Sequence, residues 1–332
     1  MEEHMKYSDI IGQDHILDHF RNAIEYGKVS HAYILNGEKG SGKKSMARLF
    51  AQALECESPD KPCGLCHSCK QCESNNHPDI KWITHEKPNT ISVADVREQL
   101  NGDIMIKPYN GSYKVYIIDE AEKLNTAAQN AILKTIEEPP AYAVILLLTN
   151  NAATFLPTIM SRCVMLNVRP LGKEVIAEYL MKNQGIPDYN ANLAAEFSDG
   201  NLGKAMNLAA SEHFNDLKDN VLSTVVHAKD MELNELVAAV KEVNNYKLEI
   251  DDYFNIMKMW YRDVLLYKAT RNIDELIFKD KVSDIIKIAE KSSFNGIQEV
   301  LDAIEKCRVR LNANVNFDLA VELMFLTINE RC

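Results

Sequence analysis

The stretch AYILNGEKGSGKKSMARLFA, residues 32–51, decides the fold class of this chain. It begins with a short apolar run, continues through a glycine-rich turn and ends in a helical pattern. Glycines let backbone amides curl around phosphate oxygens, the start of the next helix adds positive potential, and a lysine can reach the β- and γ-phosphates. Gly37, Gly40, Gly42 and Lys43 are therefore predicted to bind a nucleotide such as ATP. A glycine-rich turn without a ligand is the alternative.

The turn departs from the usual phosphate-loop pattern at its last position. Where Ser or Thr normally ligates Mg²⁺, this chain has Lys44, and Ser45 comes one residue later. A step of one residue rotates a helix by about 100°, so the Ser45 hydroxyl cannot simply take over. We expect nucleotide binding at this loop, Lys44 and Ser45 included, with impaired metal coordination and inefficient hydrolysis.

Short apolar runs recur along the first half of the chain, separated by longer segments with helical periodicity. Strands that are buried on both faces are continuous apolar runs, and their alternation with helices indicates a parallel sheet. The sequence therefore predicts an α/β core with a five-stranded, doubly wound parallel sheet. The predicted strands are residues 32–36, 80–84, 115–118, 144–149 and 164–168.

Polar side chains follow two of these strands. Asp119 and Glu120 come directly after the strand 115–118, where Asp119 would hold Mg²⁺ through water and Glu120 would orient or deprotonate the attacking water. Asn150 follows the strand 144–149, beside the expected γ-phosphate. Solvated acids and an ordinary turn are the alternatives. The separation from the phosphate loop favours the functional interpretation.

Five of the eight cysteines lie between Cys56 and Cys72. In a long cytosolic chain, clustered cysteines indicate a metal site rather than disulfides. Cys56, Cys63, Cys66 and Cys69 supply four thiolates, enough for a structural, tetrahedral Zn²⁺ with no open position. In an alternative set Cys72 replaces Cys56, and redox chemistry of the overlapping CxxC units is a second alternative.

The composition limits the possible functions. The net charge is −11, about −3 in residues 1–170 and about −8 in the rest. A protein that gripped DNA through its whole surface would be basic, so any DNA contact is expected to be local or shared. There is no apolar run of roughly 18 residues for a membrane span, and Met1–Lys6 lack the regions of a secretory signal. We expect a cytoplasmic protein of two or three domains.

After residue 170 the strand pattern gives way to helices. Residues 171–210 indicate short helices, and from 211 onward the pattern is helical throughout. Apolar residues spaced by three and four, such as Phe254, Met257 and Tyr261, predict the core of a helix bundle. We therefore expect three domains: residues 1–169 with the cysteine insertion at about 56–72, residues 170–210 and residues 211–332.

These motifs together resemble the clamp-loader branch of the AAA+ ATPases along nearly the whole chain. The similarity is carried by IIGQ at 10–13, SHAY at 30–33, HPD at 77–79, YKVYIIDEA at 113–121 and, most specifically, NAILKTIEEPP at 130–140. The resemblance implies an AAA+ module, a small helical lid at 170–210 and a collar at 211–332 that joins five subunits in a ring.

The resemblance also implies roles for single residues. Ser161-Arg162-Cys163 is similar to the segment that carries an arginine finger, so Arg162 would stabilise charge on ATP held by an adjacent motor subunit. An intramolecular salt bridge is the alternative. Lys204 stands where the family's second sensor usually has arginine, and without the bidentate fork its phosphate sensing would be weak or absent. A solvated helix lysine is the alternative there.

Two kinds of bacterial clamp-loader subunit carry both the cysteine cluster and Ser-Arg-Cys: tau/gamma and delta-prime. Lys44 and the end of the chain at Cys332 favour the delta-prime kind, whose own ATPase activity would be weak or absent. The expected partners are tau/gamma and delta subunits, the sliding clamp and primed DNA. A tau/gamma-like subunit that itself hydrolyses ATP is the alternative. A stand-alone zinc-dependent DNA-binding module is a third hypothesis, which the acidic charge opposes.

Overall fold

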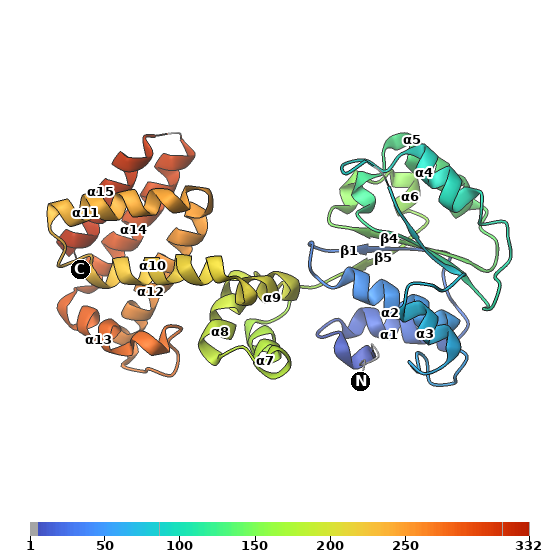
Figure 1. Ribbon diagram of the computed structural model, residues 1–332, viewed down its shortest axis with the longest axis horizontal. Helices are drawn as coiled ribbons and strands as arrows, with labels where there is room; N and C mark the ends of the chain where they lie inside the picture. Colours follow the sequence, from blue (N-terminus) through green and yellow to red (C-terminus); the bar gives the residue numbers. More distant parts are fainter. Residues whose placement is uncertain (1–5, 86, 314, 332) are drawn as a thin grey trace. The chain divides into compact units, whose positions relative to one another are not determined.

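The computed structural model describes residues 6–85, 87–313 and 315–331. Met1–Met5 and Cys332, on which two of the predictions above draw, lie outside these ranges. The chain forms two compact units (Figure 1). The first contains residues as far as Gly172 together with Asp199–Lys204, and the second contains Lys173–Ser198 together with residues from Ala205 onward.

Five parallel strands form the sheet of the first unit, which confirms the predicted α/β fold. Their order is β2-β3-β4-β1-β5, and each pair of neighbours runs parallel. The strands are β1 (Ala32–Asn36), β2 (Ile80–Ile83), β3 (Lys114–Ile118), β4 (Ala143–Thr149) and β5 (Val164–Asn167). The central strands are continuous apolar runs because helices cover both faces of the sheet.

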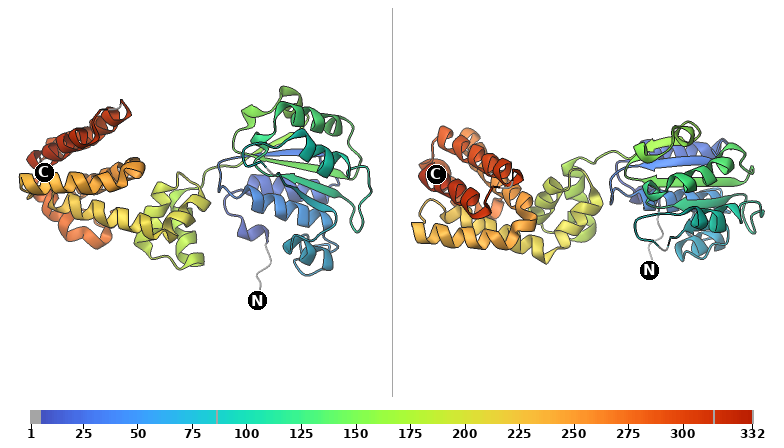
Figure 2. Two further views of the ribbon diagram at one scale, coloured as in Figure 1. Left: turned by 45° about the horizontal axis from the view of Figure 1, so that its top comes forward. Right: turned by 90° about the horizontal axis from the view of Figure 1, so that it is seen from above.

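Helices lie on both sides of this sheet, as Figures 1 and 2 show. On one face, Phe20 of α1 stacks on Phe50 of α2 with ring centroids 4.0 Å apart, and both belong to the core under the sheet. On the other face, Ile132 of α5 and Ile159 of α6 join a second core. The α-helices of this unit are α1 (Asp14–Glu25), α2 (Lys43–Glu55), α3 (His67–Glu73), α4 (Val93–Val96), α5 (Thr126–Glu137) and α6 (Pro157–Met160).

Shorter turns connect these elements. They are the 3₁₀ turns η1 (Tyr7–Asp9), η3 (Ala121–Lys123) and η4 (Ala152–Thr154), and the π-helical turn η2 (Arg97–Asn101). Helix α9 (Leu202–Ala210) begins in the first unit and continues into the second.

The second unit is helical, as predicted. Phe254, Met257 and Tyr261 of α12 are fully buried in its core, so their spacing marks a packed face. Helices α14 and α15 lie side by side (Figure 2). The elements are α7 (Lys173–Gln184), α8 (Asp188–Phe197), α10 (Glu212–His227), α11 (Leu233–Val243), η5 (Asn244–Glu249), α12 (Ile250–Thr270), η6 (Lys279–Lys281), α13 (Val282–Lys291), α14 (Phe294–Asn312) and α15 (Phe317–Arg331).

The two compact units do not coincide with the three predicted domains. Helices α7 and α8 group with the later helices rather than standing alone. The physical reason is an apolar contact: Phe197 of α8 packs edge-on against Phe214 of α10, with ring centroids 5.3 Å apart. A functional division near residues 169 and 210 stays a prediction.

The register of the sheet determines where the loops meet. Asn36 pairs with Thr149, and Ile118 pairs with Leu147, one strand further along. The chain segments that follow β1, β3 and β4 therefore emerge at one edge of the sheet. In open α/β sheets this carboxyl edge is where ligands bind.

Candidate functional site

The phosphate loop, residues 37–45, has the backbone shape that its glycines predict. Gly40 and Gly42 both have φ near +88°, a conformation that glycine adopts without steric cost. Helix α2 then begins at Lys43. The Lys43 ammonium donates hydrogen bonds to the carbonyls of Gly37, at 2.6 Å, and Glu38, at 2.7 Å. The loop thus folds around its own lysine, which is buried.

Two carboxylates from the segment after β3 lie within electrostatic reach of this lysine, in addition to Glu38 of the loop itself. Burial lowers the pKa of Lys43, while the negative charges of Glu122 and Asp119 act in the opposite direction. These acids come from the segment after β3, so the register of the sheet brings them to the loop after β1. Lys43 and Asp119, which the sequence analysis selected separately, belong to one site.

Lys44 makes the contact that distinguishes this site from an ordinary phosphate loop. Its Nζ lies 2.6 Å from Oδ2 of Asp119. Ser45 follows in the first turn of α2 and is half-buried. Mg²⁺ prefers octahedral oxygen ligands, and this arrangement offers an ammonium where a hydroxyl should be. The residues present therefore do not fit the magnesium site that the fold family implies.

The second acid, Glu120, is paired with a neighbouring lysine. It adopts a left-handed backbone conformation, with φ of +49°, and its carboxylate forms an ion pair with Lys123. The hydrogen bond from Lys123 holds the pKa of Glu120 below its ordinary value. Asn150, at the end of β4, is exposed, and its backbone N–H donates to Glu122 at 3.3 Å.

Asp199–Lys204, a segment far from the phosphate loop in sequence, forms hydrogen bonds to the loop backbone. The side chain of Asn201 donates to the carbonyl of Lys39 at 2.7 Å, and the N–H of Gly203 donates to the carbonyl of Gly40 at 3.1 Å. A Cβ atom at Gly203 would lie only 2.5 Å from the Gly40 oxygen, so glycine is required at this contact.

The sequence analysis selected a neighbour of these residues, Lys204, and missed the two that touch the loop. Lys204 forms an exposed ion pair with Asp199, 3.0 Å long. Asn201 lies 162 residues beyond its partner Lys39 in sequence, Gly203 is similarly distant from Gly40, and nothing local indicates these contacts. Their presence in the segment that resembles a second sensor was the available signal.

Arg162 follows the short helix α6 and is exposed. Its guanidinium lies 3.1 Å from the carboxylate of Glu137 and donates to the carbonyl of Thr158 and, at 3.4 Å, to the hydroxyl of Ser161. Both side chains of the Arg162–Glu137 pair are 41% exposed. An exposed pair of this kind contributes little stability and exchanges readily for another anion.

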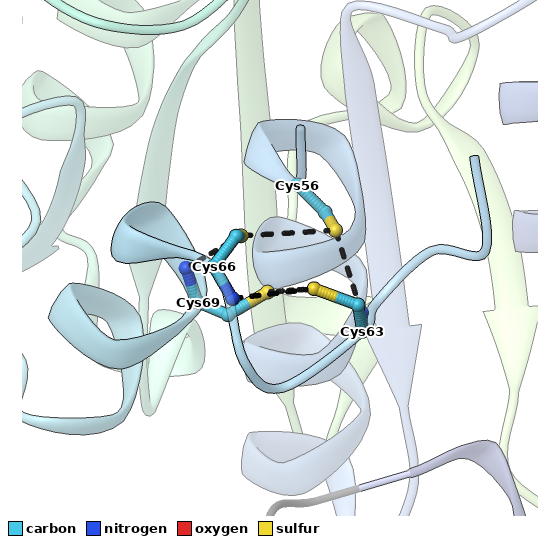
Figure 3. A group of neighbouring side chains, drawn as sticks. All are labelled: Cys56, Cys63, Cys66 and Cys69. Carbon is cyan, nitrogen blue, oxygen red and sulfur yellow. Dashed lines mark hydrogen bonds between the residues drawn. The ribbon is translucent and has the colours of Figure 1, made fainter. Parts of the chain in front are cut away.

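The four cysteines selected from the sequence, 56, 63, 66 and 69, lie together (Figure 3). All four sulfur atoms are within 4.8 Å of one another, and the Sγ–Sγ distances of Cys56–Cys66 and of Cys63–Cys69 are both 4.0 Å. Around a tetrahedral zinc with Zn–S bonds of about 2.3 Å, neighbouring sulfurs are about 3.8 Å apart. The chemistry and spacing of the donors therefore fit Zn²⁺.

Backbone amides reinforce this cluster. N–H groups of residues 63, 66 and 69 each point at a sulfur atom at 3.4 Å. Hydrogen bonds from the N–H groups of Leu65 and Cys66 lower the pKa of Cys63 to about 6, whereas burial raises the pKa values of Cys56 and Cys69. Amides that stabilise a thiolate favour the form that binds metal.

Cys72 lies outside the group of four. It is buried on α3, and burial raises the pKa of its thiol to about 12. The grouping of the sulfur atoms therefore favours the set with Cys56, and the identity of the metal ligands stays a prediction.

Comparison with known proteins identifies the family of the chain. Residues 12–172 match the family model described as "DNA polymerase III, delta subunit", and residues 213–330 match "DNA polymerase III, delta subunit, C terminal". The chain belongs to the DNA polymerase III clamp-loader subunits. This result confirms the family resemblance that the motifs indicate.

Relatives of both expected kinds are found for this clamp-loader subunit. The delta' subunit of Bacillus subtilis is 29% identical over 327 residues, which cover 96% of each chain. The tau subunit of the same organism is 27% identical over 349 residues, which cover 95% of this chain and 61% of tau. A solved DNA polymerase III gamma subunit-related protein from Thermotoga maritima aligns over 94% of this chain and 99% of its own, at 21% identity and a TM-score of 0.39.

A group of buried polar side chains, whose contacts the sequence analysis did not predict, holds the loop before β3 of this clamp-loader subunit. Glu55, His77 and Asp79 lie within 4.8 Å of one another. Asp79 accepts hydrogen bonds from two backbone N–H groups of the loop before β3, and Glu55 accepts a third, from Tyr113. Burial, with the nearby charge of Asp79, raises the pKa of Glu55 to about 8. These oxygens hold a loop in place, so we assign the group a structural role.

Among the described residues, the structure contains no helix with the length and apolar character of a membrane span.

Proposed function

We propose that this chain is a delta-prime-type clamp-loader subunit, which helps to load the sliding clamp onto primed DNA and supplies Arg162 to the ATP site of a neighbouring subunit. The observation that carries the choice of subunit type is the ion pair between Lys44 and Asp119, 2.6 Å long. It weakens the chain's own catalytic site. The similarity to a delta' subunit over nearly the full length of both proteins supports the same choice.

The surroundings of Arg162 support a role in trans. An arginine finger must leave its own subunit's contacts and bind phosphate oxygens of a neighbour as their charge develops. The exposed pair with Glu137 is weak enough to be exchanged in this way. Guanidinium provides the planar, bidentate donors that phosphate recognition requires.

The chain's own phosphate loop is proposed to bind nucleotide with little turnover. The loop backbone and Lys43 have the shape that phosphate binding requires, whereas Glu120 is paired with Lys123 rather than free to activate water. Asn150 and Lys204 are proposed to lie near the terminal phosphate. Both are exposed, so their contribution is expected to be small.

A Zn²⁺ ion is proposed at the four clustered cysteines. Four thiolates close the coordination shell, so the metal would have a structural role. It would hold residues 56–72, which are too few and too polar to form a core of their own.

The proposed partners are tau/gamma and delta subunits in a five-membered ring, with an N-terminal AAA+ module, a lid and a collar in this chain. Such an assembly would act in the bacterial cytoplasm. The net charge of −11 makes tight DNA binding by the isolated chain unfavourable. Contact with primed DNA is therefore proposed through the assembled complex.

Reconstitution with motor subunits tests the role of Arg162. An Arg162→Ala chain should assemble normally but lower ATP hydrolysis at the adjoining site by about 10³-fold, the lower end of the range for arginine fingers. Arg162→Lys should recover little, because lysine lacks the bidentate fork. Single-turnover, DNA-stimulated ATPase measurements on the assembled complex provide the readout.

Arg169→Ala serves as the control, because its side chain is exposed on the same unit and has no proposed role. Full ATPase activity in the complex that contains Arg162→Ala would contradict the proposal. A tau/gamma-like role is the alternative, favoured by the intact loop around Lys43. Rapid hydrolysis by the isolated chain that is lost in Lys43→Ala would support that alternative.

A further inference from the structure

The ammonium of Lys44 stands where an ordinary phosphate loop would present a hydroxyl to a metal ion. We propose that this chain's site binds the phosphates of a nucleoside di- or triphosphate without Mg²⁺, with Lys44 in the place of the metal. This inference rests on the proposed nucleotide binding by the same site. It is independent of the role of Arg162 in trans.

The first observation that supports this inference is the contact between Asp119 and Lys44. Its carboxylate is the one expected to hold Mg²⁺ through water, and its Oδ2 lies 2.6 Å from Nζ of Lys44. The Asp119 side chain is 25% exposed and that of Lys44 is 67% exposed. The carboxylate is thus partly shielded and already paired with a cation, while the cation faces solvent.

The charges make a metal ion unfavourable in this position. To reach Asp119, Mg²⁺ would have to displace a lysine ammonium or lie close to it, and two cations a few ångströms apart repel each other. Mg²⁺ also demands near-ideal octahedral geometry and gives up its water reluctantly. Ser45 follows one residue after the position from which a hydroxyl would ligate Mg²⁺, so its hydroxyl does not replace the missing ligand.

Lys44 can provide part of what the metal would provide. An ammonium carries three donors, and the bond to Asp119 uses one of them. The other two can bind phosphate oxygens while the bond to Asp119 persists. Lys44 would then link the acidic residue to the nucleotide, as a metal ion does in an ordinary site, but with one positive charge instead of two.

The rest of the loop is already arranged for phosphate. Contacts from Asn201 and Gly203 fix the carbonyls of Lys39 and Gly40, and the two glycines with positive φ complete the turn. Backbone N–H groups in such a turn, followed by the start of a helix, form a concave anion site. No metal is needed for this part of the binding.

Nucleotide titrations in the presence and absence of Mg²⁺ test the inference. The purified chain, with any zinc that it retains, is titrated with ATP and with ADP by calorimetry. The metal-free buffer is prepared by passage over a chelating resin rather than by adding EDTA, which would also remove zinc. We expect the wild-type affinity without Mg²⁺ to equal or exceed the affinity with Mg²⁺, because Mg²⁺ neutralises the charge that Lys43 and Lys44 attract.

A Lys44→Thr variant restores the usual hydroxyl and should behave in the opposite way. Mg²⁺ is expected to tighten its nucleotide binding about tenfold or more, since the cation now bridges Asp119 and phosphate. Lys43→Ala should lose binding in both buffers. Lys28→Thr, the same change at an exposed position outside the loop, should behave as wild type. Circular dichroism establishes that each variant is folded.

Two results would overturn the inference. The first is a wild-type chain whose affinity rises with Mg²⁺ as much as that of Lys44→Thr. The second is a wild-type chain that binds no nucleotide in either buffer. Neither result would affect the role of Arg162 in trans, which is measured by the ATPase activity of the neighbouring subunit.

Discussion

At the scale of single residues, Lys114 is a fully buried charge whose partners are defined. Its side chain is fully buried at the start of β3, and its Nζ lies 2.9 Å from Asp103. It also donates to the carbonyls of Asp103 and Ile106. Burial opposes ionisation of Asp103, but bonds from Lys114, Lys81 and Tyr116 outweigh it and hold the pKa of Asp103 below its ordinary value.

We expect Lys114→Met to destabilise the first unit by about 3 kcal/mol or more, because it removes the buried charge partner of a largely buried carboxylate and leaves two carbonyls without this donor. Lys81→Met is the matched control: Lys81 pairs with the same carboxylate at 2.8 Å, but its side chain is 39% exposed. Its loss should cost below about 1 kcal/mol. Urea unfolding at neutral pH measures both, and equal losses would contradict the importance of burial.

Residues of the candidate site could be predicted from the sequence where a short motif carries the chemistry. Lys43, Lys44 and Asp119 were selected in this way, and the sheet register brings them together. Asn201 could not be selected for its bond to Lys39, because partners so far apart in sequence share no local pattern. The pairing of Arg162 with Glu137 was foreseen only as an unnamed salt bridge.

At the scale of elements, the cysteine module, residues 56–72, is a segment whose shape we expect a metal ion to stabilise. Its sulfur atoms come from the end of α2, the loop before α3 and the first turn of α3 (Figure 3). The loop between the helices has few buried apolar side chains. Without metal, its shape depends on N–H···S bonds of 3.4 Å, which are weak.

We expect the purified chain to contain one Zn²⁺, with Cys69→Ser losing the metal and Cys72→Ser retaining it. Cys69 is fully buried within the group of four, whereas Cys72 is a buried thiol on the same helix but outside the group. Atomic emission spectrometry gives the metal content. Loss of zinc from Cys72→Ser, in a chain that is otherwise folded, would show that the ligand set includes Cys72.

The limits of the strands, which have a strong apolar pattern, were predicted closely. The five strands differ from their predicted limits by one residue at most, because buried apolar runs bounded by turns leave little freedom. The π-helical turn η2, residues 97–101, was not predicted, since it follows α4 without a break in the helical pattern. Its hydrogen-bond pattern depends on tertiary packing around Leu100, which is fully buried.

At the scale of the whole molecule, each unit has its own hydrophobic core. The buried clusters of the first unit contain the residues of the sheet and its covering helices, and the cluster of the second unit contains residues of α8 and of the later helices. Grouping α7 and α8 with the second unit required knowledge of which faces pack, because amphipathic helices do not specify their partner in sequence. Separate cores permit separate unfolding.

The two tryptophans make this testable, because each unit contains one. Trp82 lies half-buried on β2, and Trp260 lies fully buried on α12. Trp260→Phe leaves a fluorescence probe in the first unit, and Trp82→Phe leaves one in the second. Among the described residues the indole N–H of Trp260 has no hydrogen-bond partner, so phenylalanine leaves no polar group of the site unpaired.

We expect the two single-tryptophan chains to report different midpoints in urea, and removal of zinc to shift only the midpoint reported by Trp82. The cysteine module is part of the first unit, so metal binding to the folded form stabilises that unit by mass action and leaves the other unchanged. Circular dichroism of the wild type should then show a transition that is broader than two-state. Coincident midpoints that move together when zinc is removed would mean that the two units unfold as one cooperative structure.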